Sequence, residues 1–172
     1  MNDNQIKTKT NWYVLYTAPR AEKMVFLELM NRDYEVFLPM TKELKVWKNR
    51  QKKWIDKVLF PSYIFVNTLQ HELYGIKQVP KVATYLHIAG KPSTVPNKVI
   101  EGIKKMISTY KDLTVTTDFC NGEKVKIVHG PLTGYEGILV QQKGKARFGI
   151  QLNEINQTIF VEVCSSILEK LN

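Results

Sequence analysis

The pattern of apolar residues changes near residue 112, and this change limits the chain to few architectures. Before it, apolar stripes at three- and four-residue steps alternate with short runs rich in β-branched and aromatic residues. After it, only short alternating runs remain, separated by turns such as GPLTGYEG. These periods predict an α+β segment followed by an all-β segment.

The first segment has the element order of an antiparallel sheet with flanking helices. WYVLYT at 12–17 predicts a strand and RAEKMVFLELMNRDY at 20–34 a helix. Helical spacing predicts a short second helix through Leu69, Leu73 and Ile76. A third helix opens at Pro96-Asn97, with an apolar stripe of Val99, Ile100, Ile103, Met106, Ile107 and Tyr110. The apolar stripe that we expect the first helix to turn towards the sheet consists of Ala21, Met24, Val25, Leu27, Met30 and Tyr34. We place the domains at 11–112 and 122–172, with a linker at 113–121, and expect five short strands to form a barrel in the second.

The net charge of +9 belongs entirely to the first segment. Residues 1–112 hold 19 Lys and Arg against 10 Asp and Glu, whereas residues 113–172 hold 6 of each. Seven of the cations lie in KELKVWKNRQKKWIDK at 42–57, a predicted β-hairpin with a basic tip around Lys48–Lys53. This split predicts that one domain meets a polyanion and the other does not.

Several function classes find no support in the sequence. It has no nucleotide-binding, hydrolase or zinc-protease motif, and its three His are far apart. Two cysteines, Cys120 and Cys164, supply neither a disulfide framework nor a zinc site. No apolar run has the roughly 20 residues of a transmembrane helix, and the N-terminal residues are polar. We expect a cytoplasmic protein that is not an enzyme and has no cofactor or metal.

Three features each leave a structural and a functional alternative open. The basic hairpin either is a solvated tip that protects a sheet edge or binds phosphates. The aromatic residues Tyr13, Tyr16, Phe60, Tyr63 and Phe65 either form core or cover a partner-binding surface. Tyr135 stands at a glycine-rich turn, an unusual place for a large ring unless a partner covers it.

Four motifs together resemble the NusG family of bacterial transcription elongation factors. They are WYVLYTAPRAEKMV, FPSYIFV, VPNKVIEGIKKM and GEKVKIVHGPLTGYEGILV, and they span the chain from about Trp12 to Leu168. The last is similar to the KOW motif, which ribosomal proteins share. The resemblance implies an N-terminal NusG-type α+β domain, its antiparallel sheet bearing a basic hairpin, and an SH3-like KOW barrel. Length and charge are more similar to the specialised paralogues, RfaH and the UpxY antiterminators.

The resemblance also implies partners for the N-terminal domain. Docking on the clamp helices of the RNA polymerase β′ subunit is carried over to the residues that match by motif position, Tyr16, Phe60, Pro61, Tyr63 and Phe65. HELYGIK stands where RfaH has its HTTT segment, so Tyr74 and Lys77 are candidates for a contact with the β-subunit gate loop. Arg20 and Lys23 match the positions near the non-template DNA strand. The hairpin residues Lys48, Arg50, Lys52 and Lys53 add attraction to upstream DNA.

The KOW domain of the family recruits a small ribosomal subunit protein or the Rho terminator. Leu132 and Tyr135 occupy the matching turn positions. KVKIV and TIFVEV alternate cleanly and are rich in β-branched residues, so we expect a stable barrel and not the helical hairpin that RfaH can form. We therefore expect a monomeric elongation factor or antiterminator acting at particular operons. The alternatives are a KOW-containing RNA-binding protein of ribosomal type and an enzyme of unrecognised type.

Overall fold

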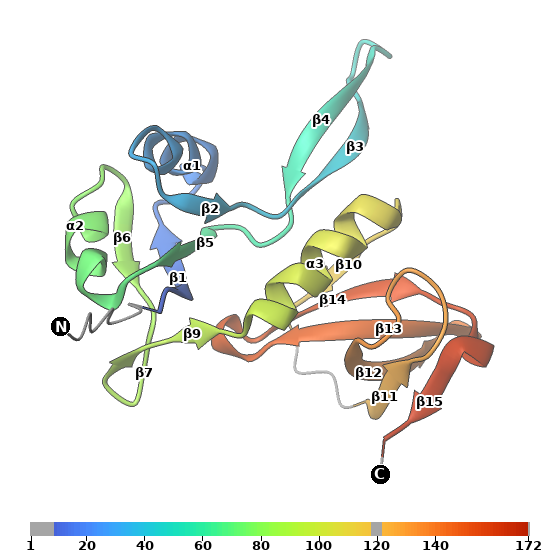
Figure 1. The fold of residues 1–172 in the computed structure, drawn as a ribbon. Helices are drawn as coiled ribbons and strands as arrows, with labels where there is room; N and C mark the ends of the chain where they lie inside the picture. The colour runs from blue at the N-terminus through green and yellow to red at the C-terminus, as the bar shows by residue number, and fades with distance from the viewer. Residues whose placement is uncertain (1–8, 118–121, 172) are drawn as a thin grey trace, which may run out of the picture. The chain divides into compact units, whose positions relative to one another are not determined.

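The computed structural model describes residues 9–117 and 122–171, which group into two compact units (Figure 1). The first runs to Leu38 and resumes over Pro61–Pro96. The second comprises Pro39–Phe60 and the chain from Asn97 onward. The basic hairpin and the helix that begins at Asn97 therefore group with the C-terminal strands. The domain limits 11–112 and 122–172, which concern independent folding, stay a prediction.

A five-stranded antiparallel sheet forms the centre of the first unit. Its strand order is β2-β5-β1-β6, with β9 also paired to β1. The strands are β1 (Asn11–Thr17), β2 (Glu35–Phe37), β5 (Tyr63–Thr68), β6 (Val82–Tyr85) and β9 (Thr94–Val95). β1 and β5 consist largely of β-branched and aromatic residues, which pack well on a pleated surface. Two shorter strands, β7 (His87–Ile88) and β8 (Lys91–Pro92), pair with each other.

Helix α1 (Glu22–Asn31) packs on the sheet through a different face from the predicted one. Ala21, Glu22, Val25 and Leu29 are buried, whereas Met24, Leu27 and Met30 are exposed. The predicted stripe is therefore wrong for three of its six members. The helix turns Glu22 inward because this carboxylate accepts a hydrogen bond from the chain just before β5. The short helices η1 (Gln70–Glu72) and α2 (Leu73–Lys77) follow β5, and α2 packs beside β6.

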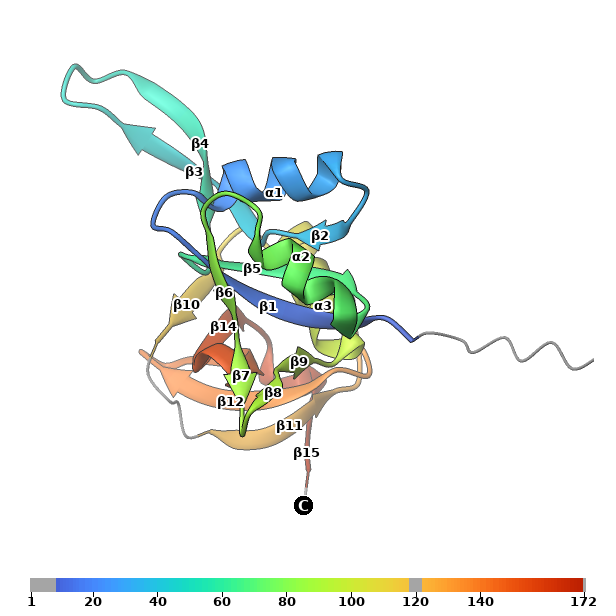
Figure 2. The same ribbon diagram turned by 90° about the vertical axis from the view of Figure 1, so that its left-hand side faces the viewer.

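The predicted basic hairpin is confirmed in the second unit. Strands β3 (Met40–Val46) and β4 (Lys52–Val58) pair in register from Met40 with Val58 to Val46 with Lys52. Their turn is closed by the Arg50 amide, which donates to the Trp47 carbonyl at 2.8 Å. In both views the turn lies beyond the other elements of its own unit (Figures 1 and 2).

The rest of the second unit is one helix and a six-stranded antiparallel sheet. Helix α3 (Asn97–Thr109) buries Ile100, Ile103 and Met106, as its apolar stripe predicts. Among the described residues no helix is long and apolar enough to cross a membrane. The sheet order is β10-β14-β13-β12-β11-β15. Its strands are β10 (Thr114–Thr116), β11 (Glu123–Ile127), β12 (Glu136–Gln142), β13 (Lys145–Leu152), β14 (Gln157–Glu162) and β15 (Leu168–Lys170), with η2 (Asn153–Ile155) and η3 (Ser165–Ile167) in the connections.

The predicted linker differs from the structure in one respect. Thr114–Thr116 is not a linker but strand β10, which pairs with β14 through Val115 opposite Ile159. The predicted five strands of the C-terminal sheet are therefore joined by a sixth. Residues 118–121, the remainder of the predicted linker with Cys120, lie outside the described residues.

Candidate functional site

Aromatic residues gather on one face of the first unit's sheet. Tyr16 and Tyr63 are direct neighbours across β1 and β5, and their ring centroids lie 5.5 Å apart. Phe65 lies two residues along β5 on the same face, and its ring centroid is 6.1 Å from that of Phe37 on β2. We call these four residues the aromatic face. Tyr16 is 39% exposed and Tyr63 partly exposed, so this end of the face offers rings and hydroxyl groups to a partner.

A buried carboxylate fixes the turn that presents Tyr63. Glu22 is only 6% exposed, and its Oε1 accepts a hydrogen bond from the Ser62 amide at 2.7 Å. The Ser62 carbonyl in turn accepts from the Thr17 amide at 2.8 Å. Ser62 has φ 68°, in the left-handed region that costs a non-glycine residue free energy. The two hydrogen bonds therefore hold a strained residue in place directly before Tyr63.

The structure brings only part of the predicted docking set to an accessible surface. Tyr16 and Tyr63 are adjacent and partly exposed, and Pro61 is exposed in the turn before β5. Phe65 and Phe60 have no exposed surface. For these two, the expectation of a displayed ring is wrong in this structure. Phe65 is a core residue. Its strand is apolar on both faces, and such a pattern does not indicate which of the two faces is covered.

The other candidates of the first unit are exposed. Tyr74 is 74% exposed and lies one helical turn before exposed Lys77 on α2, so both occupy one side of this short helix. Arg20 and Lys23 are exposed at the start of α1. Arg20 lies in the connection from β1 to α1 and has φ 62°, so a cationic side chain occupies a left-handed position there.

The hairpin carries the remaining candidate cations in the second unit. Lys48, Arg50, Lys52 and Lys53 are all exposed. Towards the base of the hairpin, Lys42 pairs with Asp56 at 2.6 Å and Lys57 with Glu43 at 3.3 Å. Within the described residues no ion pair neutralises the four cations nearer the tip. Uncompensated charge therefore accumulates towards the turn, which favours a polyanionic partner.

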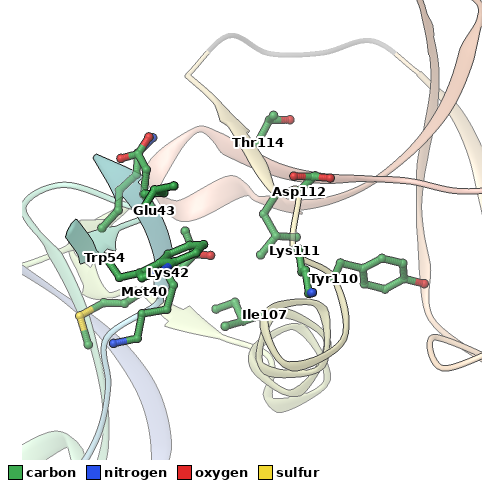
Figure 3. Close-up of a pocket in the computed structure, with 13 residues that line it drawn as sticks. Met40, Lys42, Glu43, Trp54, Ile107, Tyr110, Lys111, Asp112 and Thr114 are labelled. Carbon is green, nitrogen blue, oxygen red and sulfur yellow. The ribbon is translucent and has the colours of Figure 1, made fainter. Parts of the chain in front are cut away.

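A cleft of about 880 Å³ lies between the base of the hairpin and the end of α3 (Figure 3). Met40, Leu44 and Trp54 line it from the hairpin, and Ile107, Tyr110 and Leu113 from α3 and the chain that follows. Its lining also carries charged groups, among them Lys57 and Glu43, which form an ion pair at 3.3 Å. Across the described ranges, no cluster of three or more His, Cys, Asp or Glu could hold a metal ion.

The glycine-rich turn before β12 corrects one prediction and explains another. Leu132 is fully buried, so its expected display to a partner is wrong. Gly130 and Gly134 have φ 91° and 86°, and these left-handed residues fold the turn back so that Leu132 joins the core. Tyr135 is half-buried and packs close to Gly102 of α3, where an added methyl group would lie 3.0 Å from the ring. The ring is thus partly covered by the chain's own helix.

Sequence reasoning missed two groups of residues that shape these sites. The apolar stripe leaves Glu22 on the opposite side of the helix, with Arg20, Lys23 and Arg32, whereas the structure buries this carboxylate against the Ser62 amide. Trp47 and Trp54 are 54% and 63% exposed, and two tryptophans inside a basic run are a signal of a binding surface.

Comparisons with known proteins agree with this fold. The family model described as "Transcription termination factor nusG" matches residues 10–104, more than half of the chain. The chain is 24% identical over 173 residues to the transcription termination/antitermination protein NusG of Pseudomonas aeruginosa, covering 93% of this chain and 98% of that protein. With the protein of the same name from Bacillus subtilis it shares 26% identity over 176 residues, covering 94% and 98%.

A solved structure gives the same result for the fold. The structure titled "Domain interaction in Thermotoga maritima NusG" aligns with a TM-score of 0.56 at 18% identity, over 95% of this chain and 98% of that one. The expected fold class, an α+β sheet domain with a basic hairpin plus an all-β KOW-like domain, is confirmed. NusG proteins act as transcription factors and not as enzymes. The chain belongs to the NusG family of bacterial transcription termination and antitermination factors.

Proposed function

We propose that this protein is an elongation factor and antiterminator that docks on the clamp helices of RNA polymerase through the exposed end of its aromatic face. The observation that carries the proposal is the pair Tyr16 and Tyr63, whose rings lie 5.5 Å apart at the sheet surface. Paired tyrosines of this kind suit a protein interface, since each ring buries apolar area while its hydroxyl group meets water. Pro61 extends the same surface.

The mechanism requires binding alone. A factor that binds the elongating conformation of the polymerase more tightly than the paused one shifts the population towards elongation by its difference in affinity. Tyr74 and Lys77 on α2 supply a second contact, with the β-subunit gate loop. Arg20, Lys23 and the hairpin cations attract the non-template strand or upstream DNA, and this attraction weakens as salt rises.

The C-terminal sheet recruits a further factor in this proposal. Tyr135 is the candidate contact for a small ribosomal subunit protein or Rho, and its half-buried ring leaves part of its surface accessible. The same proposal places the protein in the cytoplasm, as a monomer, acting at particular operons. Transcript profiling of a deletion strain would test the last point, because a general factor changes most transcripts and a specialised one changes few.

The decisive experiment measures binding of the full chain to purified core RNA polymerase. Tyr63→Ala and Tyr16→Ala should each weaken binding strongly, while the chain still melts cooperatively. Tyr34→Ala is the matched control, because Tyr34 is partly buried in the same unit but lies outside the aromatic face. Equal binding by Tyr63→Ala and the wild type would refute docking through this surface. Binding to ribosomal RNA without binding to polymerase would favour the ribosomal-type alternative, against which the neutral charge of residues 113–172 already counts.

A further inference from the structure

The β3–β4 hairpin is a two-stranded ribbon without a sheet to support it. In the part of the chain that the structure describes, its strands pair only with each other. Isolated hairpins gain little stability in water, so a long one with exposed side chains needs a reason beyond folding. Its turn lies beyond the other elements of its unit in both views (Figures 1 and 2). The far half of the ribbon is therefore open to a partner on both faces.

The register divides the ribbon into two chemically different faces. Side chains directly opposite each other share a face, and successive residues alternate. Lys45 lies opposite Lys53, and Trp47 follows on the same side; we call these three residues the cationic face. On the other side Leu44 lies opposite Trp54 and Val46 opposite Lys52; we call Leu44, Val46 and Trp54 the apolar face, which Lys52 borders. Each face thus carries one exposed tryptophan in a different environment.

Trp47 is the aromatic residue that lies among the cations. The Lys45 Nζ is 5.9 Å from the centroid of the Trp47 ring, which confirms that the two side chains share a side. Trp47 is 54% exposed, so much of its indole surface remains accessible. An indole beside several ammonium groups suits a ligand that combines a flat aromatic ring with negative charge, as each nucleotide does.

The turn places a further cation at the apex. Arg50 has φ 62°, a position that favours glycine in tight hairpin turns. The Arg50 amide donates to the Trp47 carbonyl at 2.8 Å, and the Gln51 amide donates to Asn49 Oδ1 at 3.2 Å. These bonds define the turn while a guanidinium group occupies its left-handed position.

We propose that the cationic face binds single-stranded DNA, with an unpaired base stacked on Trp47 and the flanking phosphates on Lys45, Lys53 and Arg50. Stacking requires the open face of a base, which a duplex hides between neighbouring pairs. An acidic protein segment would use the cations but offers Trp47 a ring only where it also carries an aromatic residue, whereas every nucleotide combines a ring with a phosphate. The inference rests on the proposed function, because a transcribing polymerase is where the protein meets unpaired DNA.

The test is titration of the full chain with a short oligo(dT), without polymerase. Loss of one stacked base should weaken binding by about tenfold for Trp47→Leu, whereas Trp47→Phe should recover much of it. The matched control is Trp54→Leu, an exposed tryptophan of the same hairpin on the apolar face, which should bind like the wild type. A blunt duplex of equal length should bind Trp47→Leu and the wild type equally.

Fluorescence gives a second readout of the same contact. Trp12 is 3% exposed, so in Trp54→Leu the exposed indole is that of Trp47 alone. Oligo(dT) should quench this emission, and Lys45→Ala with Lys53→Ala should lower the salt dependence of binding. Unchanged oligo(dT) affinity in Trp47→Leu, an equal loss in Trp54→Leu, or tenfold tighter binding of oligo(U) would overturn the proposal. A failure of the proposed polymerase docking is a separate result, because docking is measured with Tyr63→Ala and core polymerase.

Discussion

Replacing Glu22 by alanine tests how the aromatic face is held in position. The carboxylate is almost wholly buried and accepts the Ser62 amide at 2.7 Å. Its removal leaves a partly buried N–H without this acceptor, and it removes a negative charge from the first turn of α1. A hydrogen bond to a charged group contributes about 1.5–3 kcal/mol, and the helix dipole adds about 0.3–1 kcal/mol. Allowing for partial access of water to Ser62, we expect the free energy of unfolding to fall by about 2 kcal/mol.

The effect of Glu22→Ala on the turn that presents Tyr63 should exceed its effect on the stability of the whole unit. Without Glu22, the left-handed conformation of Ser62 loses one of its two restraints, so the turn relaxes and Tyr63 moves relative to Tyr16. Polymerase binding by Glu22→Ala should therefore weaken even where the chain is fully folded. Glu22→Gln keeps an acceptor oxygen at the same place and should retain most of the stability and most of the binding.

Urea unfolding, followed by tryptophan fluorescence in a Trp47→Phe, Trp54→Phe background that leaves buried Trp12 as the fluorophore, measures the free energy of unfolding of the first unit. Binding to core polymerase is then compared without urea, at a temperature well below the melting temperature of each variant. The reasoning fails if Glu22→Ala unfolds within about 0.5 kcal/mol of the wild type, the usual range of a surface substitution. It also fails if Glu22→Gln is as damaging as Glu22→Ala, since charge and not the acceptor would then be decisive.

Two further substitutions test other contacts. Gly102→Ala gains about 1 kcal/mol of helix propensity, but its methyl group would lie 2.7 Å from Ile150 Cδ1 and 3.0 Å from the Tyr135 ring, so the packing loss should outweigh the gain. Thermal melting should show a destabilised variant and ring NMR signals a freer Tyr135, whereas Gly75→Ala on α2, with open space around it, should be neutral or stabilising. The hydrogen bond from the Thr68 hydroxyl, with a second from the Leu69 amide, lowers the pKa of Glu72. Because the pKa of Glu72 is lower in the folded chain than in the unfolded chain, this stabilisation is present above the usual pKa of a glutamate and is lost as pH falls through the folded pKa. Glu72→Gln should therefore reduce the slope of the free energy of unfolding against pH on the acid side. An unchanged slope would contradict the prediction.

Local patterns predicted the elements that depend on local information. The spacing of Ile100, Ile103 and Met106 defines the buried face of α3. The basic run between two apolar groups, Leu44, Val46 and Trp47 before it and Trp54 and Ile55 after it, defines the hairpin. The resemblance in four motifs supplied the family, which composition and periodicity alone left open. The fold class therefore followed from sequence before any coordinate was known.

The errors concern residues whose partners lie far away in the chain. Glu22 turns inward because of Ser62, forty residues later, and this exposes Met24 and Leu27 against the expected stripe. β10 exists because Val115 pairs with Ile159 of β14, and three β-propensity residues carry no such information by themselves. Apolar periodicity likewise marked Phe65 as important without indicating whether the ring is core or surface.

The hairpin register has a consequence for how this protein can diverge. Because neighbouring residues alternate sides, slipping one strand against the other by a single position would move Trp54 among the lysines of the opposite strand. The length of the five-residue connection 47–51 thus decides whether Lys53 or Trp54 lies on the side of Lys45 and Trp47. One inserted or deleted turn residue that shifts this register would bring Trp54 to the side of Trp47 and move Lys53 to the other side, without any change in the strands' own residues. In this hairpin, the length of the turn therefore determines which side chains a ligand meets on each side.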